Sequence, residues 1–329
     1  MSTQARTRQR ERGAALLMAM LTVTLVATFA AAALWQQWRS IEVEGAERAR
    51  IQSEWILTGA LDWARLLLRE DARAGGPDHL GEPWAVPLQE ARLSSFLAAQ
   101  DNVSTDTGPE VLDAFLSGQV TDLQSFLNVT NLVDNGKLSK PDLETFVRLF
   151  DLLQLPSGQL EQMAENLRLA IAPGGGDRPL VPQRIEQLVW LGLAPQTVAA
   201  LRPYITILPA RTTVNLNTAS AEVIYAAATG LSMADAQHLV AEREGAPFRK
   251  VPDASKLLPG GPAAMAEGQA NVGFNSRFFE VRARLRLDQL VVEERSVVQR
   301  NGVEVTVWQR ERGATAMAAP APAQAMSNR

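Results

Sequence analysis

The residue types that carry most enzyme chemistry are scarce in this sequence. It contains no cysteine and only two histidines, His79 and His238. The lack of cysteine excludes disulfides, thiolate nucleophiles and cysteine-based zinc or iron–sulfur sites. General-base catalysis requires a positioned partner and a nucleophile, and neither a Gly-x-Ser-x-Gly nor a His-Glu-x-x-His pattern is present. We therefore expect both histidines to lie at the surface and the protein not to be an enzyme.

One polar turn has some features of a calcium loop. It reads Asp134-Asn135-Gly136-Lys137-Leu138-Ser139. If Gly136 took the sixth position of an EF-hand loop, Val133 would take the third, where an oxygen ligand is required. We interpret the segment as a turn followed by a helix that begins at Ser139, with Asp142 completing a capping box. No metal ligand is assigned.

The most distinctive short motif is Val214-Asn215-Leu216-Asn217-Thr218-Ala219. Asn217 or Thr218 is expected to cap a helix over 219–228, and a second helix is expected over 232–244. The pair resembles a helix-hairpin-helix unit of competence-type DNA receptors. Such units grip phosphate through backbone N–H groups of a Gly-x-Gly hairpin at a helix N-terminus. The hairpin here, Thr229-Gly230-Leu231-Ser232, lacks the second glycine. We predict that the motif is structural, at Asn215, Asn217, Thr218, Ala219 and Gly230.

An uncharged apolar stretch spans residues 14–34. As a helix it would be about 30 Å long, enough to cross a bilayer core. Four arginines (Arg6, Arg8, Arg10 and Arg12) precede it, and Trp35 and Trp38 follow it like an interfacial belt. The positive-inside rule leaves the N-terminus in the cytoplasm and sends the rest of the chain across the membrane.

Three interpretations of this stretch remain open. A cleaved secretory signal has an apolar region of about 7–15 residues before a small-x-small cleavage site, which is shorter than the stretch found here. A plain signal anchor fits the length. A prepilin leader, which is basic and ends in glycine on the cytoplasmic side, fits Arg12-Gly13 followed by Ala14.

The net charge of −4 conceals an asymmetry between the N-terminus and the remainder. Residues 1–13 carry four arginines and one glutamate, a net charge of +3, which leaves −7 for the rest of the chain. An acidic extramembrane portion argues against a nucleic-acid-binding surface.

Hydrophobic periodicity predicts the elements that must position these motifs. One long helix is expected from residue 14 to about 70, because apolar residues recur at helical spacing and no proline occurs before Pro77. Residues 78–118 are weakly patterned, with a polar loop at 101–109, and 119–132 is predicted as a strand. From 139 to about 273 the chain is predicted to be wholly helical. Helices are expected there from 139, over 157–170, 182–191 and 195–202, and in the hairpin pair.

The C-terminal part has strand periodicity instead. From Phe279, apolar and charged residues alternate, 290–299 forms a second expected strand, and Asn301-Gly302 is a hairpin signal before a third strand from Val303. Residues after Gly313 are rich in Ala and Pro and are expected to be disordered. We predict an α+β fold with a helical insertion.

Taken together, these segments resemble the type II secretion system protein K family, whose members are large minor pseudopilins. The resemblance covers residues 12 to about 310, and it depends on the order of several segments. These are Arg12-Gly13, Trp63-Ala64-Arg65, Glu82-Pro83-Trp84-Ala85, Val120-Thr121-Asp122 to Asn131-Leu132-Val133, Ile185-Glu186-Gln187-Leu188, Leu208-Pro209, the motif at 214–219, and Ser276-Arg277-Phe278-Phe279.

The resemblance implies processing at the start of the apolar helix. A cytoplasmic prepilin peptidase would cut after Gly13 and methylate the new N-terminus at Ala14. Most pilin-like subunits carry Glu at the fifth mature position, which here is Met18. A subunit at the filament tip has no neighbour above it whose amine needs that carboxylate, and a buried carboxylate without a partner costs free energy.

The resemblance also implies a fold, a location and partners. It implies a pilin-like domain, a long N-terminal helix packed on a small antiparallel sheet, with a large all-α insertion containing a helix-hairpin-helix or SAM-like unit. The expected location is the tip of an inner-membrane-anchored periplasmic pseudopilus, with minor pseudopilins of the I, J and H types and the major pseudopilin. The expected parts are a leader (1–13), a transmembrane segment (14–37), the pilin-like domain (38–134 and 274–312), the insertion (135–273) and a disordered tail (313–329).

Some relatives bind calcium, so the resemblance makes calcium a possible cofactor. The acidic segment expected before the second helical subdomain is reduced here to Ala170-Ile171-Ala172-Pro173-Gly174-Gly175-Gly176-Asp177. We therefore expect no certain cofactor. Two alternative functions remain: a membrane-anchored DNA-uptake receptor that uses residues 213–250, and a minor pilin of a type IV pilus.

Overall fold

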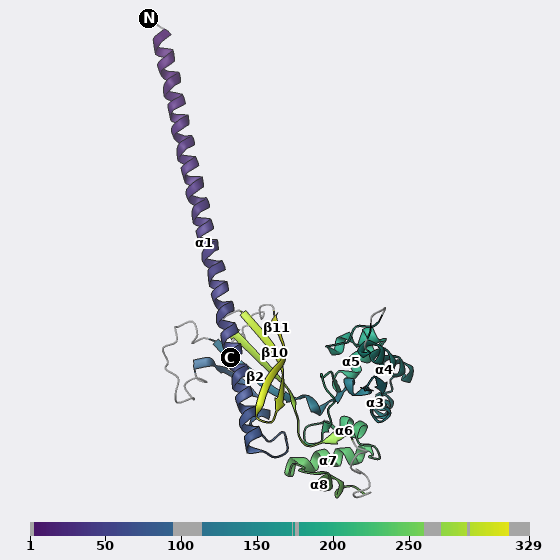
Figure 1. Cartoon of the computed structure of the whole chain (residues 1–329). Helices are drawn as coiled ribbons and strands as arrows, with labels where there is room; N and C mark the ends of the chain where they lie inside the picture. Colours follow the sequence, from purple (N-terminus) through teal and green to yellow (C-terminus); the bar gives the residue numbers. More distant parts are fainter. Residues whose placement is uncertain are drawn as a thin grey trace, which may run out of the picture. The chain divides into compact units, whose positions relative to one another are not determined.

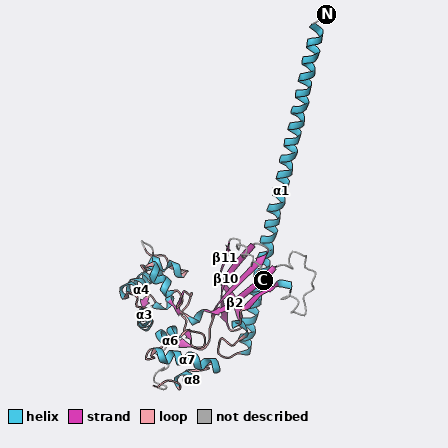
Figure 2. Ribbon diagram, turned by 180° about the vertical axis from the view of Figure 1, so that it is seen from behind, coloured by secondary structure: helices cyan, strands magenta, loops and turns pink. Residues whose placement is uncertain are grey.

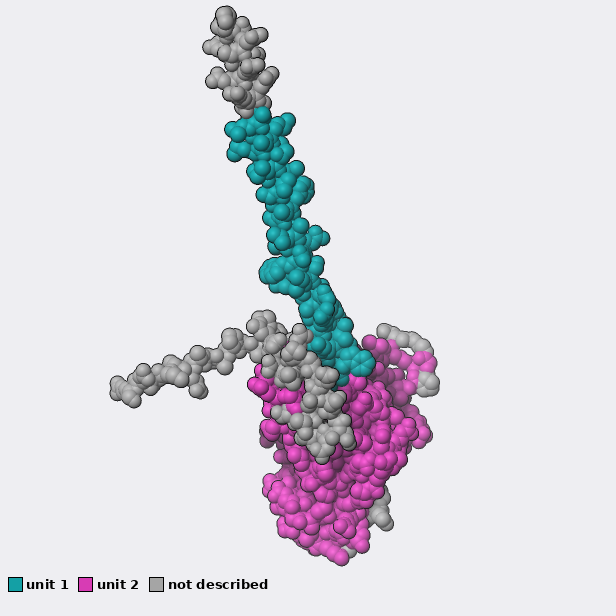
Figure 3. All heavy atoms as spheres, turned by 90° about the vertical axis from the view of Figure 1, so that its left-hand side faces the viewer, with its two compact units in different colours: residues 1–56 teal, residues 57–329 magenta. Residues whose placement is uncertain are grey.

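The structure is a computed structural model that describes residues 3–94, 114–172, 174, 178–259, 271–287 and 290–315. It divides into two compact units, residues 1–56 and residues 57–329 (Figure 3). The predicted loop at 101–109 and the tail beyond residue 315 lie outside the described residues.

Helix α1 (Thr3–Ala74) is longer at both ends than the predicted helix. It passes through Gly45 and Gly59 without a break, and Gly75, at a φ of +67°, follows its end. Among the described residues, α1 is the one helix long and apolar enough to cross a membrane, with a stretch of mean hydropathy 2.2 near the N-terminus. In the first unit its large apolar side chains, such as Leu21 and Phe29, are exposed.

The second unit contains a five-stranded antiparallel sheet in the order β1-β2-β9-β10-β11 (Figures 1 and 2). The strands are β1 (Leu88–Arg92), β2 (Ala114–Asp122), β9 (Phe278–Leu287), β10 (Leu290–Asn301) and β11 (Glu304–Thr315). Along β9, apolar residues such as Val281 and Leu285 are buried and Arg282 and Arg284 are exposed, because successive side chains of a strand point to opposite faces. The three C-terminal strands are thus confirmed.

The part of α1 that belongs to this unit, from Leu57 onward, packs on the sheet. Leu57, Leu61, Ala64 and Leu68 recur every three or four positions and are all buried, which places them on one helical face. Most of them share a core with Phe279, Val281, Val298 and Val305 of the sheet, and with Trp84 in the short 3-10 helix η1 (Pro83–Ala85). The rings of Trp84 and Phe279 meet edge to face at 5.1 Å.

The β10–β11 hairpin corrects one detail of the prediction. Its two turn residues are Gly302 and Val303, not Asn301 and Gly302, since Asn301 pairs with Glu304. Gly302 has a φ of +59° at the first turn position, a conformation that glycine adopts without strain. Strand β11 also continues past Gly313 to Thr315, so the tail does not begin at 313 as predicted.

The strand predicted at 119–132 is wrong beyond Asp122. The chain there forms the 3-10 helix η2 (Leu123–Ser125), the two-residue strand β3 (Leu127–Asn128) and the 3-10 helix η3 (Val129–Leu132). The side chain of Asp122 accepts a hydrogen bond from the Gln124 amide, and that of Asn128 accepts one from the Thr130 amide. Such local caps offer the backbone an alternative to a strand ladder.

Between β2 and β9 the chain forms a helical region with its own core. Its helices are α3 (Lys140–Leu152), α4 (Ser157–Ile171), η4 (Ile185–Leu191), α5 (Pro195–Leu201), α6 (Ala221–Ala227), α7 (Met233–Gly245) and α8 (Val251–Ser255). Phe146, Leu149 and Phe150 of α3 are each buried in this core, as their spacing predicts.

The prediction that this region is wholly helical is wrong in detail. Strand β3 pairs in parallel with β6 (Ile205–Thr206), and β7 (Val214–Asn215) pairs in parallel with β8 (Val272–Gly273). A small hairpin, β4 (Val133–Asp134) with β5 (Lys137–Leu138), forms at the predicted turn. Two-residue strands leave no periodicity that a sequence pattern could reveal.

Two predicted helix caps also differ. The Ser139 hydroxyl donates to the Asp142 carboxylate and makes no cap to the backbone, although α3 does begin after Ser139. Helix α6 is capped by Ser220, whose hydroxyl accepts from the Val223 amide, and not by Asn217 or Thr218. Asn217 and Thr218 do not cap α6, because their side chains are buried and make tertiary contacts.

Candidate functional site

The helical region leaves the sheet at Asp122 and returns to it at Ser276, and buried polar residues hold these two connections together. Asp122 is only 2% exposed. One of its carboxylate oxygens accepts hydrogen bonds from the Ser276 hydroxyl (2.6 Å), the Thr218 hydroxyl (2.6 Å) and the Asn215 amide (3.0 Å). The other oxygen accepts from the Gln124 amide at 2.7 Å. Burial raises the pKa of Asp122, and these donors oppose that rise.

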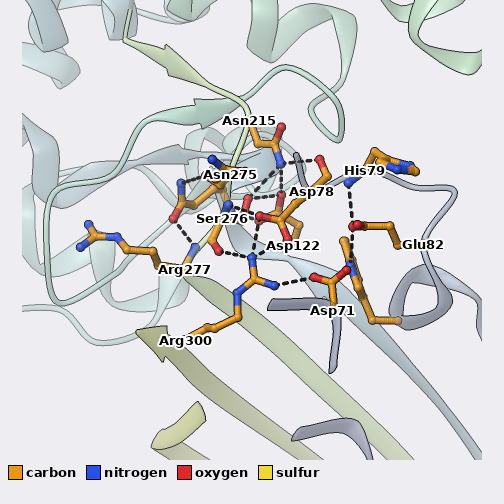
Figure 4. A network of polar contacts seen from close by, with 12 residues as sticks. Asp71, Asp78, His79, Glu82, Asp122, Asn215, Asn275, Ser276, Arg277 and Arg300 are labelled. Carbon is orange, nitrogen blue, oxygen red and sulfur yellow. Dashed lines mark hydrogen bonds and ion pairs between the residues drawn. The ribbon is translucent and has the colours of Figure 1, made fainter. Parts of the chain in front are cut away.

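Arg300 approaches the same place from β10. Its guanidinium donates to Asp71 at the end of α1 (2.6 Å), to Asp78 in the following loop (2.6 Å) and to the Ser276 carbonyl (2.9 Å). It also lies over the ring of Phe279, 4.9 Å from the ring centroid. We call Asp78, Asp122, Asn215, Ser276 and Arg300 the joint (Figure 4).

Asp78 completes the joint by contacts through its backbone and side chain. Its carboxylate accepts from the Ser276 amide at 2.6 Å, and its carbonyl accepts from the Asn215 side chain at 3.1 Å. Its own amide donates to the Phe274 carbonyl at 2.9 Å. The joint therefore links the end of α1, both connections of the helical region and the motif at 214–219, all with residues that are 9% exposed or less.

Negative charge exceeds positive charge beside the joint. Asp71, Asp78 and Glu82, which we call the carboxylate cluster, each offer an oxygen within 4.8 Å of the others. Burial raises the pKa of Asp78 to about 6, against the opposing effect of Arg300. Burial and the neighbouring carboxyl group of Asp71 raise the pKa of Glu82 to about 7. Glu82 accepts from the indole of Trp84 at 2.7 Å and from the His79 amide at 3.0 Å.

The carboxylate cluster does not fit a calcium site. Calcium takes six to eight oxygen ligands, several of them from unengaged carboxylates. Here the Arg300 guanidinium donates to both Asp71 and Asp78, so a protein cation already occupies the space between them. Among the described residues, no second group of three metal-ligand side chains lies this close together.

We therefore expect calcium to leave the stability of the protein unchanged. The melting temperature of the detergent-solubilised chain should be the same within about 1 °C in millimolar calcium and in EGTA. A site occupied at 100 times its Kd would add about 2.7 kcal/mol, which would raise the melting temperature by several degrees. A rise of that size with calcium but not with magnesium would contradict the conclusion that the carboxylate cluster does not bind calcium.

Of the helix-hairpin-helix-like residues, Asn215, Asn217, Thr218 and Ala219 are buried, and Gly230 is exposed. The side-chain amide of Asn217 makes two hydrogen bonds with the backbone of Phe248. Its Nδ2 donates to the Phe248 carbonyl at 2.9 Å, and its Oδ1 accepts from the Phe248 amide at 2.8 Å. The Arg243 guanidinium donates to the carbonyls of Leu216 and Ala219, both at 2.6 Å. Ala219 is fully buried, and Gly230 has a φ of +92° in the turn between α6 and α7. Every polar side chain of the motif is thus committed to internal contacts.

The N-terminus of α7 is a poor phosphate site. Ser232 caps it, and the Asp235 carboxylate accepts from the Ser232 amide at 2.9 Å. Hydrogen bonding to Ser232 lowers the pKa of Asp235, so a negative charge occupies the place that a phosphate would take. This geometry argues against a DNA receptor.

The remaining predicted residues lie apart from the joint. His238 is exposed, 4.0 Å from Glu242, as expected. His79 is half-buried in the loop after α1, and its Nδ1 accepts from the Gly81 amide. Gly13 and Ala14 lie within α1, in the stretch whose side chains are not described, and Met18 is 66% exposed in the first unit.

Sequence reasoning missed Asp78, Asp122, Ser276 and Arg300 as a group. Arg300 is 222 positions from Asp78, and Asp122 is 154 positions from Ser276. No motif spacing can join residues that far apart. The one local signal was that Asp122 and Ser276 each belong to a segment on which the family resemblance depends.

Comparisons with known proteins point to one family. Two models described as type II secretion system (T2SS), protein K match residues 125–210 and 214–273. The type II secretion system protein K of Pseudomonas aeruginosa is 26% identical over 311 residues, 85% of this chain and 86% of that protein. That of Pectobacterium carotovorum subsp. carotovorum is 25% identical over 341 residues, 93% of this chain and 98% of that protein.

A solved structure is similar to this one. It is a chain in the crystal structure of the GspK-GspI-GspJ complex from the enterotoxigenic Escherichia coli type 2 secretion system. The two share 15% sequence identity with a TM-score of 0.59, over 82% of this chain and 99% of that chain. At this identity, the likeness shows that the two chains share a fold.

Proposed function

We propose that this chain, which belongs to the type II secretion system protein K family, works at the tip of a periplasmic pseudopilus. It is a minor pseudopilin of the type II secretion system, and the resemblance seen in the sequence is thereby confirmed. At the tip it initiates or caps pseudopilus assembly during the export of folded proteins across the outer membrane. The role is structural and involves no catalysis.

The buried joint is the observation that carries the tip location. Because Asp122 and Arg300 tie both chain connections and the end of α1 together, the helical region is held against the sheet as one body with it. A bulky region held in this way would obstruct a subunit that stacked above the sheet. A subunit at the end of the filament meets no such neighbour.

The start of α1 supports the same location. We propose that the chain is cut after Gly13, methylated at Ala14 and anchored in the inner membrane by residues 14–37, with the remainder in the periplasm. Met18 then takes the fifth mature position, where filament subunits carry Glu. A tip subunit has no neighbour above it to supply an amine, so an apolar side chain avoids burying an unpaired charge.

Partners follow from the same proposal. The similar solved chain comes from a complex of GspK with GspI and GspJ, and we propose that this chain assembles with pseudopilins of the I, J and H types on the major pseudopilin. Its sheet and α1 form the pilin-like part. Helices α6 and α7 form a retained helix-hairpin-helix unit that fastens the insertion and binds no nucleic acid.

One purification tests the proposal with two readouts. The tagged full-length chain, extracted in detergent from membranes of a strain that expresses the whole secretion system, should have an N-terminal peptide that begins at N-methylated Ala14. The I-type and J-type pseudopilins should co-purify with it in equal amounts. The matched control is Gly13→Leu, which should keep residues 1–13 and lose both partners.

Two results would contradict the proposal. An intact leader on the wild-type chain would make it a plainly anchored protein. Correct processing with only type IV pilus proteins co-purifying would move it to a different filament.

A further inference from the structure

The loop over residues 75–82 follows α1, begins with two glycine residues and carries Asp78 of the joint. Gly75 and Gly76 have φ values of +67° and +123°. The far end of the loop is held by Glu82, which accepts from the Trp84 indole, and the middle by Asp78, which accepts from Arg300. An open cavity of about 420 Å³ borders the loop, lined by residues that include Asp71, Glu82 and Arg277.

The charges around this loop do not balance when every group is ionised. Asp71 on α1, Asp78 and Glu82 on the loop, and Asp122 at the end of β2 supply four negative charges. Arg300 on β10 is the cation that donates to this group, and it serves Asp71 and Asp78. The other charged or titratable neighbours are His79, Arg277 and Arg249, which line the adjoining cavities. The Arg277 guanidinium donates to the Arg211 carbonyl.

Within the carboxylate cluster, Arg300 donates to Asp71 and Asp78, and Glu82 is the third member. The Trp84 indole and the His79 amide donate to it, and the Asp71 carboxylate offers an oxygen within 4.8 Å of a Glu82 oxygen. Two ionised carboxylates with oxygens within 4.8 Å of each other repel. A proton shared between them removes this repulsion. Asp71 and Glu82 therefore favour a state in which the pair holds one proton over a state in which both carboxylates are ionised.

We propose that a proton shared by Asp71 and Glu82 latches the loop 75–82 onto the end of α1, and that losing this proton opens the loop. The same loop carries Asp78, which bonds the Ser276 amide and the Asn215 side chain. Opening it removes contacts from the joint, so the hold on the helical region weakens as pH rises. This latch is independent of the proposed location at the pseudopilus tip.

Stability is expected to fall as pH rises, because burial and Asp71 raise the pKa of Glu82 to about 7. Between the ordinary glutamate value of about 4.3 and 7, the folded chain keeps a proton that the unfolded chain has lost. Stability from this group is complete at the acid end of that window and falls as pH rises through it. The raised pKa of Asp78, about 6, acts in the same direction.

Hydrogen exchange of the full-length chain in detergent tests the latch. Between about pH 5.5 and about pH 8.5, protection of the peptide covering residues 75–86, corrected for the intrinsic pH dependence of exchange, should fall about tenfold or more, since one pKa unit corresponds to a factor of ten. Glu82→Gln, which carries no charge and can donate to Asp71, should keep its protection at the higher pH. Glu186→Gln, at an exposed ion pair with Arg202, should behave as wild type.

Three outcomes would overturn the latch. The first is equal protection of the wild-type loop at both pH values. The second is a Glu82→Gln variant that loses protection with pH as wild type does, or that fails to fold near neutral pH, where a neutral side chain should be at least as stable. The third is calcium restoring wild-type protection at the higher pH, which would assign the site to a metal ion instead of a proton.

Discussion

Replacing Arg300 with alanine is expected to lower the free energy of unfolding of the second unit by about 3–5 kcal/mol, the range for removing one partner of a buried ion pair. The arginine side chain is buried, and its loss leaves Asp71 and Asp78 without their cation. It also leaves the Ser276 carbonyl without that donor. Denaturant unfolding of the detergent-solubilised chain, followed by tryptophan fluorescence, measures the loss.

The matched control is Arg202→Ala. Arg202 also pairs with a carboxylate, Glu186, but its side chain is 67% exposed. Exposed pairs contribute about 0–1 kcal/mol, so this variant should unfold almost as wild type does. Arg300→Lys should recover only part of the lost stability, because a lysine cannot reproduce the forked contacts of a guanidinium. Equal losses for Arg300→Ala and Arg202→Ala would show that Arg300 contributes no more to the free energy of unfolding than an arginine in an exposed ion pair.

Asp122→Ala is expected to be similarly severe, at about 3–5 kcal/mol, and to free the helical region from the sheet. The substitution leaves the Asn215 amide and the Thr218 and Ser276 hydroxyls buried without their acceptor, and each such group costs about 1–3 kcal/mol. Limited proteolysis should then cut the two connections, residues 123–126 and 274–277, before it cuts the sheet or the helical core.

Two further variants separate the joint from a general loss of stability. Asp122→Asn keeps one oxygen, and the two hydroxyls can rotate to accept from its amide, so the loss should be milder than for alanine. Asp134→Ala changes an exposed aspartate in the β4–β5 turn and should unfold within about 0.5 kcal/mol of wild type. If Asp122→Ala unfolded the sheet and the helical region together, with no early cleavage at the connections, the joint would not be the weak point between them.

The motif at 214–219 resembles part of a nucleic-acid-binding unit, but its polar side chains make contacts within the protein. Asn215 and Thr218 direct their polar groups to Asp122, and Asn217 directs its own to the backbone of Phe248. The Asp235 carboxylate lies at the helix N-terminus that would otherwise attract phosphate. The same helical pair therefore serves here to fasten one part of the chain to another.

The sequence by itself determined the elements whose signals are local. The apolar run at 14–34 indicates a membrane-spanning helix, the alternation from Phe279 indicates strands, and the spacing of Phe146, Leu149 and Phe150 indicates a helix face. Each signal repeats within a few residues, so it is readable without any knowledge of the fold. The ordered set of segments was enough to show the resemblance to the type II secretion system protein K family, whose models match residues 125–210 and 214–273.

Only the tertiary structure decided where β2 ends and what Asn215 and Thr218 do. The strand stops at Asp122 because its carboxylate caps the next turn and collects donors from Ser276 and Asn215. Arg300, an arginine in an ordinary-looking strand, contacts Asp71 across 229 positions of sequence. Contacts of that span depend on how the sheet, α1 and the helical region pack in three dimensions, and periodicity along the chain carries no record of them.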